Sequence, residues 1–247
     1  MTGFQFSECV SPAICDKLAN ISFINYKTIM ESRGGDVIIN SSSWNQLKNY
    51  CKNMMKNDYD IVQQYDYGKE NTFGYGRQYL QGYGLQTMPR EFRAVLCGDA
   101  YHDFDMVNCA PTLILKIIND EEYSVNSSKL LEYINHREDK LISIMESDMV
   151  SRSDAKDMFI KSLYSKNTPL NKKGKKIKNK FFQSFDAEIK LIQLSFENRN
   201  VELKKIMKIK DNKYHQGKLM CHIVQKLECE LLNKAITSID TDGDHWK

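Results

Sequence analysis

The sequence predicts an α+β protein that is mostly helical and contains a small antiparallel sheet. Several segments place apolar residues at a period of 3.6, which indicates helices buried on one side. A glycine-rich stretch from Gly68 to Gly84 alternates with aromatic residues, as in paired strands, although the same aromatics can also stack on bases. With 247 residues, the chain is long enough for one substantial core, or one core with a lobe.

The elements of the first half follow from local signals. Residues 1–42 mix apolar and polar side chains without a clean period, Gly34-Gly35 marks a turn, and the segment suggests no function. Ser43 is expected to cap a helix whose core positions are Trp44, Leu47, Cys51 and Met54. Residues 101–107 read as a strand, and Pro111 as a first-turn residue of the next helix.

The second half is predicted to be helical except for one loop. Residues 128–145 form one expected helix, and Ser151-Arg152-Ser153-Asp154 has the form of a capping box that starts another. Residues 172–180 carry six lysines and almost nothing apolar, which indicates an exposed loop that either follows a phosphate backbone or is simply solvated. Two more amphipathic helices follow, with apolar positions Phe185, Ile189, Ile192 and Phe196, and then Leu219, Ile223, Leu227 and Leu231.

Four residues of the capped helix lie at four-residue steps and therefore share one face: Arg152, Lys156, Ile160 and Tyr164. This stripe has two cations at one end and an aromatic ring at the other. It suits a nucleoside triphosphate, because the cations can meet the phosphates and the ring can lie near the sugar and base. The alternative for this segment alone is a solvated helix face.

A second cluster lies earlier in the chain: Gly76-Arg77, eight intervening residues, Gln86, and Pro89 three further on. It resembles the glycine-arginine to leucine-glutamine-x-isoleucine-proline block of family A DNA polymerases. The helix stripe resembles the fingers motif of that family, Arg-x3-Lys-x3-aromatic-x3-Tyr-Gly, which single-subunit RNA polymerases largely share. Ile160 and Ser165 depart from that motif. The resemblance implies that Arg77, Gln86 and Arg93 contact a primer-template duplex, and that the stripe binds the incoming nucleotide.

Asp103 and Asp105 lie where that family has its first catalytic aspartate. In a strand the two carboxylates share a face about 7 Å apart, and such pairs hold Mg²⁺ (or Mn²⁺) for phosphoryl transfer. Register with the family motif favours Asp103, with Asn108 as the residue that senses the nucleotide sugar. If Asp105 is the ligand, Ala110 takes that position, and DNA and RNA synthesis are not distinguished. The remaining alternative is that one aspartate caps the following helix. The D-x-D-x-x-N-x-x-P pattern also resembles polymerase-like proteins of large DNA viruses, phages and mobile elements.

The last catalytic motif of the family is not evident. In the family a helix that contacts template and primer precedes it, which implies such a role for Gln225, although a plain surface glutamine fits as well. A second catalytic aspartate should follow on an apolar strand, whereas the chain continues with the polar segment 239–247, including Asp242 and Asp244. We expect a polar terminus there. It fits a shortened gene product, a sequence that is cut short before the motif, or a polymerase whose active site another polypeptide completes.

The composition limits which partners, metal sites and compartments the sequence can be expected to have. The net charge of +3 is small, so affinity for nucleic acid must come from local patches. Seven cysteines without a CxxC pair argue against a zinc site or disulfide framework and fit a reducing compartment. No stretch of 18 apolar residues occurs, so we expect a soluble cytoplasmic or nuclear protein without a membrane partner.

The sequence thus predicts a template-directed nucleic acid polymerase, a nucleotidyltransferase similar to family A DNA polymerases, with primer-template, nucleoside triphosphates and magnesium as partners. Lys156 joins Asp103 and Asp105 as an expected catalytic residue. The expected organisation is an N-terminal helical region (1–70), a palm (71–120), and fingers with C-terminal helices (121–247). An RNA polymerase or primase, or a non-catalytic nucleic-acid-binding protein, remains an alternative.

Overall fold

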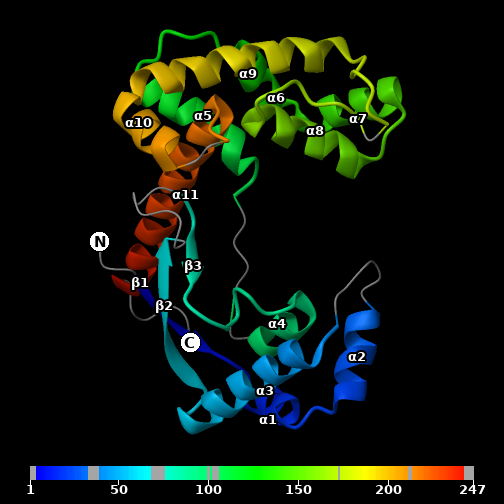
Figure 1. The fold of residues 1–247 in the computed structure, drawn as a ribbon, viewed down its shortest axis with the longest axis vertical. Helices are drawn as coiled ribbons and strands as arrows, with labels where there is room; N and C mark the ends of the chain where they lie inside the picture. Colours follow the sequence, from blue (N-terminus) through cyan, green and yellow to red (C-terminus); the bar gives the residue numbers. More distant parts are fainter. Residues whose placement is uncertain are drawn as a thin grey trace. The chain divides into compact units, whose positions relative to one another are not determined.

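The computed structural model describes residues 4–32, 39–67, 76–98, 101, 106–171, 173–210 and 213–241. It is mostly helical and has one three-stranded antiparallel sheet, so the predicted α+β class is confirmed (Figure 1). The chain divides into two compact units. Unit 1 comprises Met1–Thr72 and Gln78–Asp105, and unit 2 comprises Phe73–Arg77 and Met106–Lys247.

Unit 1 contains the sheet. Its strands are β1 (Phe4–Cys9), β2 (Asp60–Tyr67) and β3 (Gln78–Leu80), in the order β1-β2-β3 with both pairs antiparallel. Tyr65 of β2 is opposite Phe4 on one side and Leu80 on the other. The pairing of β2 with β3 agrees with a strand role for the glycine-aromatic stretch; residues 68–75, between them, lie outside the described residues.

Four helices complete unit 1: α1 (Pro12–Ala19), α2 (Phe23–Glu31), α3 (Ser41–Lys56) and α4 (Arg90–Cys97). The predicted core positions Leu47, Cys51 and Met54 are fully buried on α3. The predicted cap at Ser43 is wrong. Asn40 caps α3, because its side-chain oxygen accepts a 2.8 Å hydrogen bond from the Ser43 N–H, and the helix therefore starts three residues earlier than predicted.

Unit 2 is helical: α5 (Cys109–Asp120), α6 (Ser128–Asn135), α7 (Arg137–Asp148), α8 (Arg152–Tyr164), α9 (Lys180–Arg199), α10 (Val201–Lys210) and α11 (Gln216–Thr241). Helix α9 packs against α6, α8, α10 and α11 (Figure 1). Its fully buried apolar side chains are those predicted, Phe185, Ile189, Ile192 and Phe196, together with Phe182. Helix α9 is therefore the central helix of this unit's core.

The single helix predicted over 128–145 is wrong, because the chain breaks at His136. That residue has φ −128° and ψ 37°, outside the helical region, and it ends α6 and precedes α7. The periodicity of this segment predicts Leu130, Ile134, Leu141 and Met145 as inward residues; Leu130 and Leu141 are fully buried, and Ile134 and Met145 are half-buried. Helical periodicity survives the break since each half keeps its own apolar face.

The predicted strand 101–107 is not present at its described positions. Tyr101 lies outside any strand, and its hydroxyl accepts a 2.8 Å hydrogen bond from the Cys9 N–H; Val107 lies in a turn. Residues 102–105 lie outside the described residues. Helix α5 starts at Cys109, so Pro111 is its third residue, and the predicted aspartate cap is wrong because Asn108 occupies the cap position.

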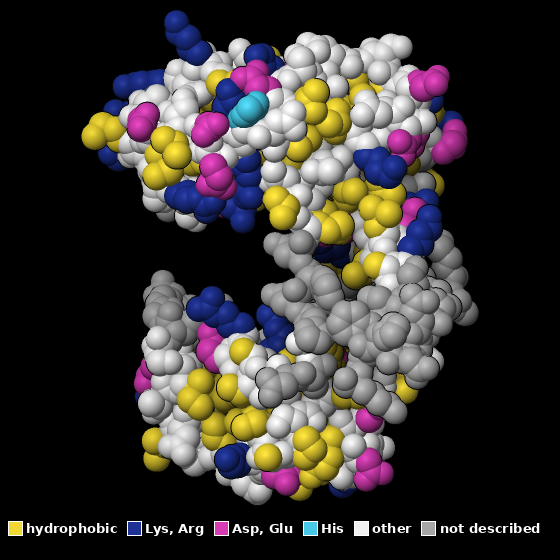
Figure 2. All heavy atoms as spheres, turned by 180° about the vertical axis from the view of Figure 1, so that it is seen from behind, with side chains coloured by type: hydrophobic (Ala, Val, Ile, Leu, Met, Phe, Trp, Pro, Cys, Tyr) yellow, Lys and Arg dark blue, Asp and Glu magenta, His cyan; other side chains and the backbone are white. Residues whose placement is uncertain are grey.

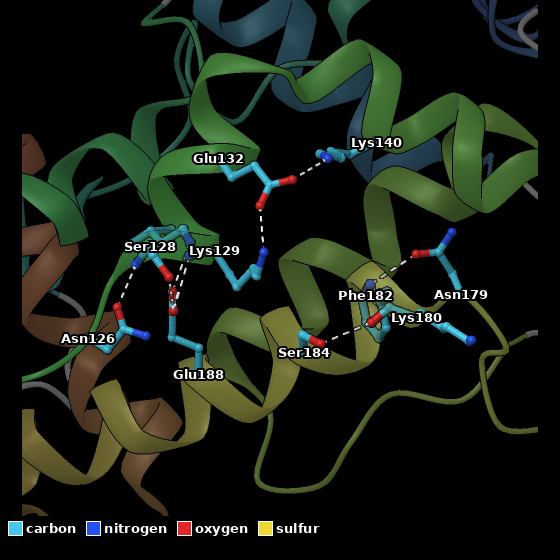
Figure 3. Close-up of polar contacts among 11 residues, drawn as sticks. Asn126, Ser128, Lys129, Glu132, Lys140, Asn179, Lys180, Phe182, Ser184 and Glu188 are labelled. Carbon is cyan, nitrogen blue, oxygen red and sulfur yellow. Dashed lines mark hydrogen bonds and ion pairs between the residues drawn. The ribbon is translucent and has the colours of Figure 1, made fainter.

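Buried and half-buried polar groups hold the helices of unit 2 together (Figure 3). The Glu188 carboxylate of α9 accepts hydrogen bonds from the N–H groups of Lys129 (3.0 Å) and Leu130 (2.8 Å) and so caps the start of α6. Glu132 of α6 forms ion pairs with both Lys129 and Lys140. In the part of the chain that the structure describes, no helix is long and apolar enough to cross a membrane.

Candidate nucleotide and nucleic-acid site

Helix α8 carries the predicted cationic stripe. The Ser151 hydroxyl accepts a 3.2 Å hydrogen bond from the Asp154 N–H, so the predicted cap is confirmed and the helix begins at Arg152. The stripe residues Arg152, Lys156 and Ile160 are exposed, whereas Tyr164 is half-buried. The opposite face is buried and contains Ala155, Met158, Phe159 and Leu163. The arrangement is a cationic surface at one end of the helix and a half-buried aromatic at the other.

The end of α8 near Tyr164 is fixed by side chains of α9. Asp186, which is almost fully buried, accepts 2.7 Å hydrogen bonds from the hydroxyls of Ser162 and Thr168. Gln193 donates to the carbonyl of Leu163 at 2.7 Å, and Lys190 donates to that of Ser165 at 2.7 Å. Carbonyls in the last turn of a helix lack intrahelical partners. These side chains supply donors to that turn and to the residue after it, so they hold Tyr164 in place.

The two cations of the stripe differ in their surroundings. Arg152 forms an exposed two-pronged ion pair with Glu138 of α7, at 2.7 and 2.8 Å from one nitrogen to the two carboxylate oxygens. Hydrogen bonding from Arg152 lowers the pKa of the Glu138 carboxyl. Within the described residues, Lys156 forms no ion pair. Lys156 is therefore the stripe cation available to a phosphate, and Arg152 becomes available by leaving Glu138.

A cluster in unit 2 brings together residues that are far apart in the sequence. The Arg77 guanidinium pairs with the Glu228 carboxylate of α11, with nitrogen-oxygen distances of 3.4 Å. The Cys109 Sγ lies 3.8 Å from the same carboxylate. Burial and then the neighbouring Cys221, Glu228 and Cys109 raise the pKa of the Tyr164 phenol, and the positive charge of Arg77 opposes that shift. Arg77 of the first predicted cluster therefore lies near Tyr164 of the second.

Helix α11 comes unusually close to the end of α8. A Cβ atom added to Gly217 would lie 2.3 Å from the Tyr164 carbonyl oxygen and 2.6 Å from its carbon. Contacts under 3 Å between these atom types are prohibitive, so only glycine fits there. Gly217 thus allows α11 to bring Glu228 into the same cluster as Tyr164.

Gln86 and Arg93, the other predicted duplex contacts, belong to unit 1, where they organise the turn before α4. The Gln86 side-chain oxygen accepts a 2.7 Å hydrogen bond from the Leu80 N–H, and its nitrogen donates to the Gln78 carbonyl at 3.1 Å. Its amide thus pairs with the backbone of β3 as a neighbouring strand would. Arg93 is exposed and donates to the Leu85 carbonyl at 3.3 Å.

Glu8 of β1, which is 3% exposed, also stabilises the turn before α4. Its carboxylate accepts hydrogen bonds from the Tyr50 hydroxyl (2.9 Å), the Tyr65 hydroxyl (3.1 Å) and the Leu85 N–H (3.1 Å). A buried carboxylate needs such donors because burial removes its water. Glu8 therefore fixes the position of Leu85, next to Gln86.

The remaining predicted residues are placed as follows. Asp103 and Asp105 lie outside the described residues, as do Asp242 and Asp244. Asn108 is half-buried in the left-handed conformation (φ 53°), and its side chain donates to the Ile134 carbonyl at 3.4 Å. Gln225 is half-buried on α11. Among the described residues, no group of three or more His, Cys, Asp or Glu side chains is arranged to hold a metal ion.

Sequence reasoning gave no role to three acidic residues: Glu228, Glu138 and Glu8. Glu228 lies three residues after Gln225 on the predicted helix, so its side of the helix could be foreseen. Its partner Arg77 is 151 positions away, and no local pattern identifies such a pair. Glu138 and Glu8 likewise gain their partners only through the tertiary fold.

Comparisons with protein-family models, with curated proteins and with solved structures found no match.

Proposed function

We propose that this protein is a template-directed nucleic acid polymerase, similar to family A DNA polymerases, that adds nucleotides to a primer 3'-hydroxyl. The observation that carries the proposal is the proximity of Arg77 and Tyr164 in one cluster with Glu228. The sequence motifs that contain Arg77 and Tyr164 resemble two blocks of that family. The two blocks serve one active site there, and the proximity of Arg77 to Tyr164 within unit 2 supports a shared site here.

Each residue of the stripe has a role in this proposal. Lys156 and Arg152 hold the triphosphate, the first as a point charge and the second as a fork. The ring of Tyr164 lies against the incoming nucleotide, beside Ile160. Tyr164 is suited to a packing role because its ring is half-buried and its phenol, like any tyrosine phenol, is uncharged at neutral pH. Arg77, Gln86, Arg93 and Gln225 hold primer and template, and Asn108 senses the sugar.

The proposal assigns magnesium to Asp103 and Asp105. A bound magnesium ion lowers the charge of the triphosphate and activates the primer hydroxyl. Two carboxylates are the ligand type that magnesium prefers, and Mn²⁺ can take the same ligands.

The test is primer extension by the purified chain with magnesium and either deoxyribonucleotides or ribonucleotides. The matched variants are D103A/D105A and D58A/D120A, which remove equal charge; Asp58 and Asp120 lie in other parts of the chain. Extension by the wild type that is lost only in D103A/D105A supports the proposal and gives the sugar preference. A preference for ribonucleotides would assign an RNA polymerase or primase of the same superfamily.

Binding of primer-template without extension would mean a non-catalytic nucleic-acid-binding protein, or an active site that a second polypeptide completes. Adding a cell extract fraction depleted of endogenous polymerase activity separates these two outcomes, because only the second gains extension that depends on Asp103 and Asp105.

A further inference from the structure

We propose that the segment 170–180 of unit 2, here called the lysine hairpin, binds the phosphate backbone of nucleic acid. This inference rests on the proposed function only in the choice of nucleic acid as the partner. The segment joins α8 to α9, and its lysines at 173, 175, 176, 178 and 180 are all exposed. Residue 172 lies outside the described residues and takes no part in the argument.

The lysine hairpin has a defined backbone. Leu170 and Lys176 form an antiparallel bridge, and the Asn171 N–H donates to the Lys175 carbonyl at 2.9 Å. The Asn171 side-chain oxygen accepts from the N–H groups of Lys173 (3.0 Å) and Lys175 (2.9 Å), while Gly174 turns the chain with φ +69°. These bonds reduce the conformational entropy that the lysines would lose on binding a ligand.

The second half of the lysine hairpin is anchored to the core of unit 2. Ile177 is 3% exposed, and Asn179 is also buried and caps α9 through the Phe182 N–H at 2.9 Å. The Asp148 carboxylate at the end of α7 accepts from the N–H groups of Lys178 (2.7 Å) and Asn179 (3.2 Å). Residues 177 and 179 therefore point inward, and the lysines at 176, 178 and 180 are exposed.

The three exposed lysines of this half alternate with two buried residues. Each ends in a cation on a flexible four-carbon stem, and one strand of double-helical DNA carries one phosphate per about 3.4 Å of axis. Three such lysines close together on the chain can therefore contact phosphates of one strand.

The charge of the lysine hairpin is not cancelled by neighbouring acids. Elsewhere in unit 2, Glu132 forms ion pairs with Lys129 and Lys140, and Glu138 forms one with Arg152. Within the described residues, the five exposed lysines of the hairpin form no ion pair. Asp148 lies beside the segment, and its oxygens accept hydrogen bonds from backbone N–H groups at the base of the segment. On the face drawn in Figure 2, charged side chains of both signs are interspersed, and the net charge of the whole chain is only +3, so five exposed lysines within eight residues are a local excess of positive charge.

An anionic membrane is a poorer partner. Membrane-surface segments combine lysines with aromatic or aliphatic side chains that insert between lipids. The inward-facing Ile177 is buried here, and Leu170 is the apolar residue of the segment that reaches the surface. A surface that offers several charges and little apolar area favours the phosphate backbone of nucleic acid over a lipid surface.

The test measures binding of a fluorescent 20-nucleotide single strand, and of the same sequence as a duplex, by anisotropy at several salt concentrations. The variant is K176Q/K178Q/K180Q, and the matched control is K17Q/K52Q/K56Q, which removes three exposed lysines from unit 1. The plot of log K against log salt has a negative slope, and each lysine lost from a phosphate contact reduces the magnitude of that slope by about 0.7 for a single strand and about 0.9 for a duplex. We expect the magnitude to be smaller by about 2 to 3 in the hairpin variant and nearly unchanged in the control.

Equal slopes in the two triple variants, or tighter binding of the wild type to phosphatidylserine vesicles than to either oligonucleotide, would overturn the inference. K176R/K178R/K180R keeps the charge and should keep the slope. If the glutamine triple variant does not fold, as judged by circular dichroism, K178Q alone should still lower the slope by about 0.7 to 0.9. Nucleic acid binding that shows these changes, without primer extension either by the chain alone or after addition of the cell extract fraction, would support the lysine hairpin and refute the polymerase.

Discussion

Gly217→Ala tests the close contact between α11 and α8, on which the Tyr164 cluster depends. In an ordinary helix, this change would stabilise the protein by about 0.5 to 1 kcal/mol, because alanine has the better helix propensity. Here the new methyl carbon would lie 2.3 Å from the Tyr164 carbonyl oxygen. A normal carbon-oxygen contact is about 3.3 to 3.6 Å, so the two helices must separate by about 1 Å.

The neighbouring atoms belong to the backbone, so no side-chain rotation can relieve the overlap. Overpacking in a core costs typically about 1 to 3 kcal/mol, and the size of this overlap favours the upper value. After subtracting the gain in helix propensity, we expect the free energy of unfolding of unit 2 to fall by about 2 kcal/mol.

The assay is urea unfolding followed by far-ultraviolet circular dichroism, in a W246F background in which Trp44 is the one tryptophan. Trp44 fluorescence reports on unit 1 and should keep its midpoint, while the transition of unit 2 moves to lower urea. S153A, an exposed helix substitution on α8, is the control and should not destabilise unit 2. A G217A midpoint equal to or above that of the wild type would refute the close contact.

Three further predictions address individual carboxylates. Hydrogen bonds from Lys129 and Lys140 lower the pKa of Glu132 from 4.5 to about 2. The contribution of the ionised Glu132 carboxylate to stability is therefore complete above about pH 4.5 and is lost as the pH falls towards 2. The thermal midpoints of the wild type and E132Q should differ at pH 5 and converge near pH 2. A difference that stays constant with pH would contradict this. E188A leaves the first N–H groups of α6 without their buried acceptor and should lower the free energy of unfolding in urea by about 2 kcal/mol. E188Q keeps one acceptor oxygen and should lower it less. Equal losses in the two variants would be inconsistent with capping. E138Q releases Arg152 from its ion pair and should lower the KM for nucleoside triphosphate in primer extension, and an unchanged KM would argue against a phosphate contact by Arg152.

Helices that carry their own signals could be predicted from the sequence. The cap at Ser151 and the apolar series of α8 are local, and α9 has a continuous buried face, so both agree with their predicted positions. The break at His136 was missed because α6 and α7 have matching apolar periodicity on both sides of it. The cap of α3 was misplaced by three residues because serines follow Asn40 in a run, and each is a good capping residue.

The candidate site was predictable only in part. The spacing on α8 placed Arg152, Lys156 and Tyr164 on one face, because four-residue steps determine this within a helix. Contacts between side chains of different elements could not be predicted in this way. The pairing of Arg77 with Glu228, and of Arg152 with Glu138, depends on how helices pack, which local periodicity does not encode. The bonds of the Gln86 amide to β3 likewise depend on sheet pairing and could not be predicted, while its predicted contact with a duplex stays a prediction.

The most direct test of the central claim is steady-state primer extension by K156A and K161A. Both lysines are exposed on α8, but only Lys156 lies on the stripe that we propose binds the triphosphate. A charge-assisted hydrogen bond contributes about 1.5 to 3 kcal/mol, so K156A should raise the KM for nucleoside triphosphate, or lower kcat/KM, by about ten- to a hundredfold. K161A should behave as the wild type. Equal effects of the two substitutions, or extension that neither changes, would contradict the assignment of α8 as the nucleotide-binding helix.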